Sequence, residues 1–195
     1  MKDTLKMLGT LTLFVFVAGL LLAATYQVTK APIDAARQKE TLDALKKVMP
    51  ACDNDVVADA RTVTDGDSVW TFYVGRQGGT FSGSAFRSTA PGYGGDIEVL
   101  VGLTPEGNVT RIEILAADKE TPGLGSKVRQ PAFRDRFGGR AADGSARVAV
   151  STDGGDIQGI TGATISSRAV CAAVRRGLDV YARRSDEIRG PGSAQ

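Results

Sequence analysis

The longest apolar run of the chain lies near its N-terminus. Residues 7–26 read MLGTLTLFVFVAGLLLAATY and contain no charged side chain. An α-helix rises about 1.5 Å per residue, so about 20 residues span the ~30 Å hydrocarbon core of a bilayer. A cleaved signal peptide is the alternative, but its apolar segment is usually shorter, about 7–15 residues. The pattern therefore favours an uncleaved membrane helix.

Charged residues on either side of this run orient it only weakly. Lys2 and Lys6 precede the apolar segment, and Lys30 and Arg37 follow it. Lysine and arginine are in excess on the cytoplasmic flank of membrane helices. Because two lysines stand on the very short N-terminal flank, we expect residues 1–6 in the cytoplasm. The rest of the chain is then expected on the outer, periplasmic side of the inner membrane, held in the lipid bilayer by a single pass.

A helical pattern follows the span. In residues 32–48, Pro32 suits the first turn of a helix, an imperfect apolar stripe comes next, and Pro50 ends the pattern. We expect this helix to form most of a linker, residues 27–50, between the anchor and a globular domain.

Period-two alternation then replaces helical spacing. Residues 69–74 (VWTFYV) and 96–102 (DIEVLVG) have the β-branched and aromatic content of strands. The turn residues 105–108 (PEGN) separate the second strand from residues 109–115 (VTRIEIL), where polar and apolar side chains alternate. This spacing predicts an antiparallel hairpin with one buried and one solvated face. Residues 75–95 are rich in glycine and serine and receive no strand prediction.

The last third of the chain predicts a short helical turn over residues 131–137, a short strand over 147–150 and a long helix over 164–188. The expected buried side of the long helix comprises Ile165, Ala169, Ala172 or Ala173, and Leu178 or Tyr181. Its arginines fall mainly elsewhere and are expected to be solvated, an acidic partner surface being the less favoured alternative: Arg168, Arg175, Arg176, Arg183 and Arg184.

These elements predict an α+β fold: a membrane helix, a linker helix, and a domain over residues 51–189 whose antiparallel sheet is packed by helices. Residues 190–195 are expected to be a flexible tail. The length of 195 residues suits one domain plus an appendage, and 42% hydrophobic residues allow a packed core.

The composition excludes several kinds of chemistry. A net charge of +2 gives no bulk electrostatic case for nucleic-acid binding. The chain has no histidine, which removes a Ser-His-Asp triad, a histidine-ligated metal and a histidine general base. Cys52 and Cys171 are far apart and form no CxxC motif, so no metal site is expected. The two could pair outside the cytoplasm, but a buried, unpaired Cys171 is favoured.

The strongest chemical signal is the junction at the start of the long helix, residues 161–167 (TGATISS). A Gly-Ala pair leaves room for close approach to the backbone, and hydroxyl residues follow at the helix N-terminus. Free N–H groups and the helix dipole make such an end a good phosphate site. On composition alone the commoner explanation is that serine and threonine cap the helix. The segment is not a Walker A loop, because the chain contains no GK[ST] sequence.

A second glycine-rich stretch is residues 119–127 (KETPGLGSK), directly after the predicted hairpin. Pro122 and Gly123 form a turn, and glycines on both sides of Leu124 let backbone amides face outward around one apolar side chain. Such a loop could present amides to the polar edge of a flavin and Leu124 to its ring, although alone it is more often only a turn.

Together the two stretches resemble the FMN-binding subunit family of the bacterial respiratory complexes Rnf and Nqr. The resemblance covers nearly the whole chain and rests on PGYGGDIEVLVGL, then KETPGLG, then the (S/T)GAT element, in that order behind one membrane helix. Members of the Nqr branch are typically longer, so the length favours the Rnf branch.

The resemblance implies a covalent cofactor. In this family FMN is attached through its phosphate to the threonine that ends (S/T)GAT, which is Thr164 here, and a flavin transferase makes the phosphoester. The other residues implied in cofactor binding are Thr161, Gly162, Ala163, Ser166, Glu120, Thr121, Gly123, Leu124 and Gly125. An acidic residue is often found three positions before the (S/T); this chain has Gln158 there, and Asp156 nearby could compensate.

The implied function is electron transfer. The chain would be an electron-carrying subunit of a membrane-bound ion-translocating ferredoxin:NAD oxidoreductase, working with the other membrane subunits of the Rnf complex. It would be a relay within a translocase, with no catalytic residue of its own. The alternatives are a subunit of the sodium-translocating NADH:quinone reductase, and a membrane-anchored sensor or binding module without a redox role.

Overall fold

The computed structural model describes residues 2–145 and 147–190. Within them the chain divides into two units, one ending at Leu42 and one beginning at Asp43. The first unit is the greater part of a long helix, α1 (Lys2–Val48), which contains a segment long and apolar enough to cross a membrane. The prediction that a separate helix begins at Pro32 is wrong, because α1 continues through this proline. An internal proline removes one backbone hydrogen bond from a helix, at a cost of about 3 kcal/mol, and does not always end it.

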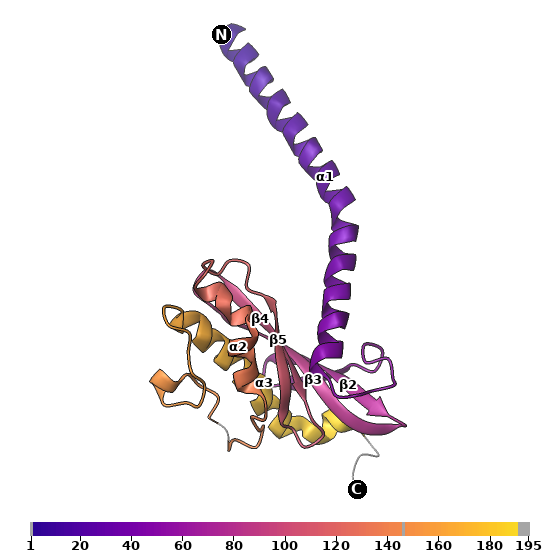
Figure 1. The fold of residues 1–195 in the computed structure, drawn as a ribbon. Helices are drawn as coiled ribbons and strands as arrows, with labels where there is room; N and C mark the ends of the chain where they lie inside the picture. Colours follow the sequence, from indigo (N-terminus) through magenta and orange to yellow (C-terminus); the bar gives the residue numbers. More distant parts are fainter. Residues whose placement is uncertain (1, 146, 191–195) are drawn as a thin grey trace. The chain divides into compact units, whose positions relative to one another are not determined.

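The second unit is built on one sheet of five strands, each antiparallel to the next and in chain order (Figure 1). The strands are β1 (Arg61–Asp65), β2 (Ser68–Gln77), β3 (Thr80–Pro91), β4 (Asp96–Leu103) and β5 (Val109–Ala116). The predicted hairpin is confirmed: β4 and β5 pair with Val101 opposite Ile112. The sequence predicted neither β1 nor β3.

The long helix α3 (Thr164–Arg189) covers one face of this sheet (Figure 1). The helix predicted over residues 164–188 is confirmed, as is the burial of Ala169, Ala173, Leu178 and Tyr181. The expected burial of Ile165 is wrong, because this side chain is 48% exposed in the first turn, beside a pocket that opens there. The five arginines listed from the sequence are exposed as expected, and three of them form ion pairs: Arg168 with Asp153, and Arg183 and Arg184 with Asp65.

The opposite face of the sheet is covered in part by the last turn of α1. Ala44, Leu45 and Val48 are buried in a cluster with Ala85 and Leu100. The Thr110 hydroxyl donates a hydrogen bond to the Val48 carbonyl. The compact unit therefore begins at Asp43, earlier than the expected domain boundary at residue 51, because the end of α1 is part of its core.

Short elements connect β5 to α3: η1 (Gly125–Arg129), α2 (Pro131–Arg134), η2 (Asp135–Phe137) and η3 (Ser151–Asp153). The helical turn predicted over 131–137 is confirmed by α2 and η2. The strand predicted over 147–150 is wrong: Val150 forms only an isolated bridge with Ile157. The backbone turns here, with the Ala149 N–H donating to the Arg147 carbonyl at 2.7 Å, so the buried valines do not extend a strand. Of the expected tail, Gly190 follows α3, and residues 191–195 lie outside the described residues.

Candidate cofactor site

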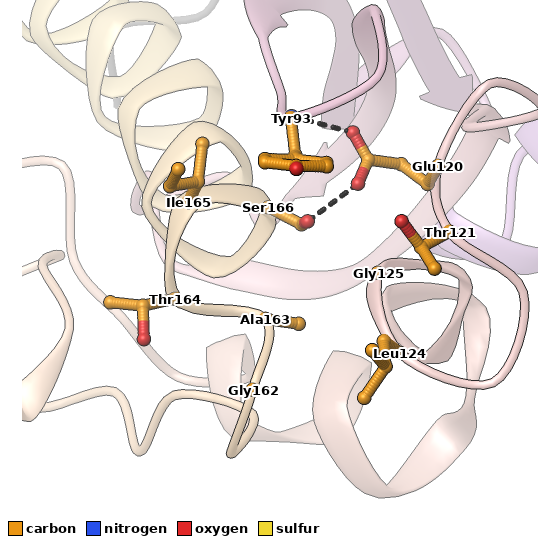
Figure 2. A pocket seen from close by; sticks show the side chains of 10 residues that line it. All are labelled: Tyr93, Glu120, Thr121, Leu124, Gly125, Gly162, Ala163, Thr164, Ile165 and Ser166. Atoms are coloured by element: carbon orange, nitrogen blue, oxygen red, sulfur yellow. Dashed lines mark hydrogen bonds between the residues drawn. The ribbon is translucent and has the colours of Figure 1, made fainter.

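A cavity of about 530 Å³ opens where three segments of the second unit meet (Figure 2). They are the loop after β3, the segment that leads into η1, and the junction that begins α3. Its volume lies within the range of about 300–1,000 Å³ typical of small-molecule sites. The lining residues are Tyr93, Glu120, Thr121, Leu124, Gly125, Gly162, Ala163, Thr164, Ile165 and Ser166.

The two glycine-rich stretches singled out in the sequence thus meet in one pocket, although they are about forty positions apart. Of the residues implied in cofactor binding, only Thr161 and Gly123 are not among those that line the cavity. Both lie at exposed turns; Gly123 has a φ of +76° and leads the chain into η1.

Sequence reasoning missed Tyr93 and Ile165 as parts of this site. Tyr93 stands in the PGYGG segment, which carried the family resemblance but suggested no role for the ring. It is 69% exposed at the rim of the cavity. Ile165 had been assigned to the buried side of the helix. With Leu124, which is 42% exposed, these side chains are the large apolar residues left open around the pocket.

The start of α3 decides between the two interpretations of its hydroxyl residues. The N-cap is Ala163, which makes no side-chain capping hydrogen bond, so the capping explanation is wrong for Thr164 and its neighbours. The Ser167 hydroxyl instead accepts the Ile160 N–H and donates to the Ala163 carbonyl, both at 3.0 Å. The first turn of the helix therefore presents its partial positive charge to the pocket without a side-chain cap, and half-buried Thr164 is its first residue.

Buried polar groups hold the pocket together. The Ser166 hydroxyl donates to Glu120 Oε2 at 2.6 Å, and the Tyr93 N–H donates to Glu120 Oε1 at 2.8 Å (Figure 2). The Gly94 N–H also donates to Oε1, at 3.2 Å. Gly162 permits the turn before the helix with a φ of +79°, and a Cβ at this position would lie 3.2 Å from Leu124 Cδ2. The glycine thus keeps the mouth of the cavity open beside Leu124.

The residues before the junction are engaged elsewhere. The Asp156 carboxylate lies 3.6 Å from Arg140 and accepts the Arg147 N–H at 3.0 Å. The Gln158 carbonyl accepts a hydrogen bond from Arg136. One turn into α3, Arg168 binds Asp153 through two bonds of 2.6 and 2.7 Å, and these hydrogen bonds hold the pKa of Asp153 below its ordinary value. The pairing fixes the preceding loop to the helix.

Comparison of the sequence and the fold with known proteins gives the class of protein. The FMN-binding domain family matches residues 92–179, which include every lining residue of the cavity. The crystal structure of NqrC from Shewanella oneidensis superposes with a TM-score of 0.50 over 66% of this chain and 70% of that one, at 18% identity, a likeness that shows the fold alone. The chain is an FMN-binding-domain protein with an apolar N-terminal helix.

Relatives along nearly the whole sequence narrow this class. The chain is 37% identical over 188 residues to the G subunit of the ion-translocating oxidoreductase complex of Cereibacter sphaeroides, covering 93% of this chain and 85% of that protein. It is 33% identical over 169 residues to the G subunit of the proton-translocating ferredoxin:NAD(+) oxidoreductase complex of Clostridium ljungdahlii, covering 87% and 86%. The chain belongs to the family of these G subunits of ion-translocating oxidoreductase complexes, the Rnf branch favoured by the sequence.

Proposed function

We propose that this chain is the electron-carrying subunit of a membrane-bound, ion-translocating ferredoxin:NAD oxidoreductase, and that it carries FMN as a phosphoester on Thr164. The observation that carries the proposal is the position of Thr164. It is the first residue of a helix without a side-chain cap, and it lines a cavity with exposed apolar side chains. A phosphate and an apolar ring are the two ends of a flavin mononucleotide.

The residues present fit this group. The uncapped N-terminus of α3 suits the phosphate, and the apolar side chains of Tyr93, Leu124 and Ile165 suit the ring. The helix dipole contributes only about 0.3–1 kcal/mol to binding an anion, which is far too little to retain a cofactor. A covalent bond supplies the retention, and outside the cytoplasm it prevents loss of FMN. When bound, FMN supplies the electron-transfer chemistry, and the protein binds, orients and tunes it.

The attachment needs a donor in which the FMN phosphate already carries a leaving group. The Thr164 hydroxyl gives up its proton, its oxygen bonds to phosphorus, and the bond from phosphorus to the leaving group breaks with its electron pair. No electron transfer occurs in this step. A flavin transferase, the partner that the family resemblance implies, would perform this step.

The proposal also includes the location of the protein in the cell. The apolar segment of α1 would cross the inner membrane once, with the FMN-binding domain on the periplasmic side. Electrons would then pass between this FMN and the other membrane subunits of the Rnf complex. A net charge of +2 gives no basis for a nucleic-acid partner.

The test is intact-protein mass spectrometry of the chain purified from cells that also express the flavin transferase. We expect the added mass of one FMN, and a fluorescent band after denaturation. Thr164→Ala and Thr164→Val should lose the adduct completely, whereas Thr164→Ser should retain part of it, because only the hydroxyl is chemically required. Thr62→Val is the matched control, since Thr62 is exposed on β1, outside both the cavity lining and the (S/T)GAT element, and its loss should leave attachment intact. An adduct on the Thr164→Val protein would disprove the assignment.

A further inference from the structure

Glu120 is the buried carboxylate of the pocket. This residue is only 4% exposed, and its two oxygens accept hydrogen bonds from three donors at two places in the chain. One oxygen binds the two consecutive amides of Tyr93 and Gly94, and the other binds the hydroxyl of Ser166. The carboxylate therefore links three segments: its own segment before η1, the loop after β3 and the first turn of α3 (Figure 2).

The space around this carboxylate is formed by glycines. A Cβ added at Gly92 would lie 2.3 Å from Glu120 Oε1, and one added at Gly125 would lie 2.2 Å from Oε2. Neither distance is possible for real atoms, so any side chain at these positions would move the carboxylate. Glycine on both sides lets the two oxygens reach their donors within a closely packed wall.

The three donors are neutral groups, two amides and a hydroxyl. They stabilise the carboxylate by hydrogen bonding but do not cancel its charge. The negative charge thus lies among lining residues of the cavity, in surroundings where electrostatic interactions are stronger than in water.

Tyr93 connects this arrangement to the cofactor. Its amide is held by Glu120 while its ring stays 69% exposed at the pocket, on the side of Ile165 in Figure 2. A flat aromatic side chain with a fixed backbone suits stacking against another planar ring. Glu120, which is 27 residues away in sequence, thus holds the backbone that carries this ring.

We propose that Glu120 is a positioning residue of the flavin site: its carboxylate fixes Tyr93 against the ring, and its charge sets the potential at which the flavin accepts electrons. The inference rests on the proposed function. Each electron that arrives adds a negative charge to the pocket, and a nearby carboxylate opposes it. Removing the charge while keeping the hydrogen bonds must therefore shift the midpoint potential in the positive direction.

Two substitutions separate the hydrogen bonds from the charge. In Glu120→Gln the amide oxygen can accept the Tyr93 and Gly94 N–H groups, and the NH₂ can donate to the Ser166 oxygen, so only the charge is lost. In Glu120→Ala both are lost. The matched control is Asp118→Asn, which removes the same charge from a carboxylate that is 84% exposed and paired with Arg129.

The experiment uses the full-length chain in detergent, with and without attached FMN. Amide hydrogen exchange of Tyr93 and Gly94 reports positioning, and a redox titration of the flavin absorbance reports the potential. Glu120→Ala should speed exchange of the two amides by about tenfold or more, since a bond to a charged acceptor is lost. Glu120→Gln should keep exchange slow and shift the potential in the positive direction, well beyond any shift in Asp118→Asn.

Two results would overturn the proposal. Unchanged exchange in Glu120→Ala would show that the carboxylate does not hold Tyr93. Equal potentials for Glu120→Gln and Asp118→Asn would show that its charge does not act on the flavin. Exchange is also measured on the unmodified chain, so the positioning role is decided even where FMN fails to attach to Thr164, a result that would count against the proposed function. Should Glu120→Ala not fold, Glu120→Gln still tests the charge, and Ser166→Ala tests one bond of the network.

Discussion

At the scale of single residues, the shape of the cofactor pocket depends on positions that lack a side chain. Gly125 begins η1 directly beside the Glu120 carboxylate and the Ser166 hydroxyl, which bond to each other at 2.6 Å. A Cβ at Gly125 would lie 2.2 Å from Glu120 Oε2 and 2.8 Å from Ser166 Oγ. Both partners are buried.

Gly125→Ala should therefore break the bond between Glu120 and Ser166. Overpacking of a buried site typically costs about 1–3 kcal/mol, and we expect a loss of this size in the free energy of unfolding. Denaturant titration of the wild type and the variant measures it. Gly159→Ala is the control, because a Cβ there would meet its nearest neighbours at an ordinary 3.7–3.8 Å. Equal destabilisation of both variants would contradict this account.

The residues of the site could be predicted where they belong to a local sequence pattern. Thr164 and Leu124 stand in local patterns, a loop before a helix and a glycine-flanked turn, so their segments could be singled out from the sequence. Tyr93 and Ile165 could not, because their exposure results from contacts between distant segments. Tyr93 is held at the rim by Glu120, and Ile165 faces a cavity that exists only when three segments meet.

At the scale of elements, α3 approaches the sheet unusually closely at one point. A Cβ added at Gly177 would lie 1.9–2.4 Å from three ring atoms of Phe86. Phe86 is fully buried, with its ring centroid 5.6 Å from that of Phe72 and 6.2 Å from that of Trp70. The helix glycine is a packing requirement of this aromatic cluster.

Two effects compete in Gly177→Ala. Alanine favours a helix over glycine by about 1 kcal/mol, whereas overpacking costs about 1–3 kcal/mol. At these distances we expect overpacking to dominate and the melting temperature to fall. Phe86→Leu removes the ring atoms that clash, so the double variant should be more stable than the sum of the two single changes predicts, by about 0.5–3 kcal/mol. Strict additivity in thermal melts would show that Gly177 and Phe86 do not interact.

The size of the buried side chains explains which strands the sequence predicted. β2, β4 and β5 bury β-branched and aromatic residues on one face, and their alternation was visible. β3 is a strand rich in glycine, serine and alanine, and Ser84, Ser88 and Ala90 are buried there without bulk. Small side chains give little periodic signal, so the sequence did not predict a strand. Residues 147–150 show the opposite error: Val148 and Val150 are buried, but local backbone bonds prevent a strand.

At the scale of the whole molecule, α1 belongs to both units of the chain. Its apolar segment lies in the first unit, and its last turn is packed in the core of the second. Leu45 and Val48 are each 1% exposed, and the Val48 carbonyl accepts a hydrogen bond from Thr110. The anchor and the folded domain are therefore joined by a helix whose end is itself part of the fold.

Two fragments test this joint. A fragment that begins at Asp43 should fold without detergent, because it lacks the apolar segment and keeps the buried turn. A fragment that begins at residue 51 loses Leu45 and Val48, whose full burial is worth about 1.5–3 kcal/mol each, so it should be less stable by about 3–6 kcal/mol or fail to fold. Urea titrations compare the two, and Leu45→Ala in the longer fragment should fall between them. Coincident unfolding midpoints for the two fragments would mean that the last turn of α1 contributes nothing to the domain.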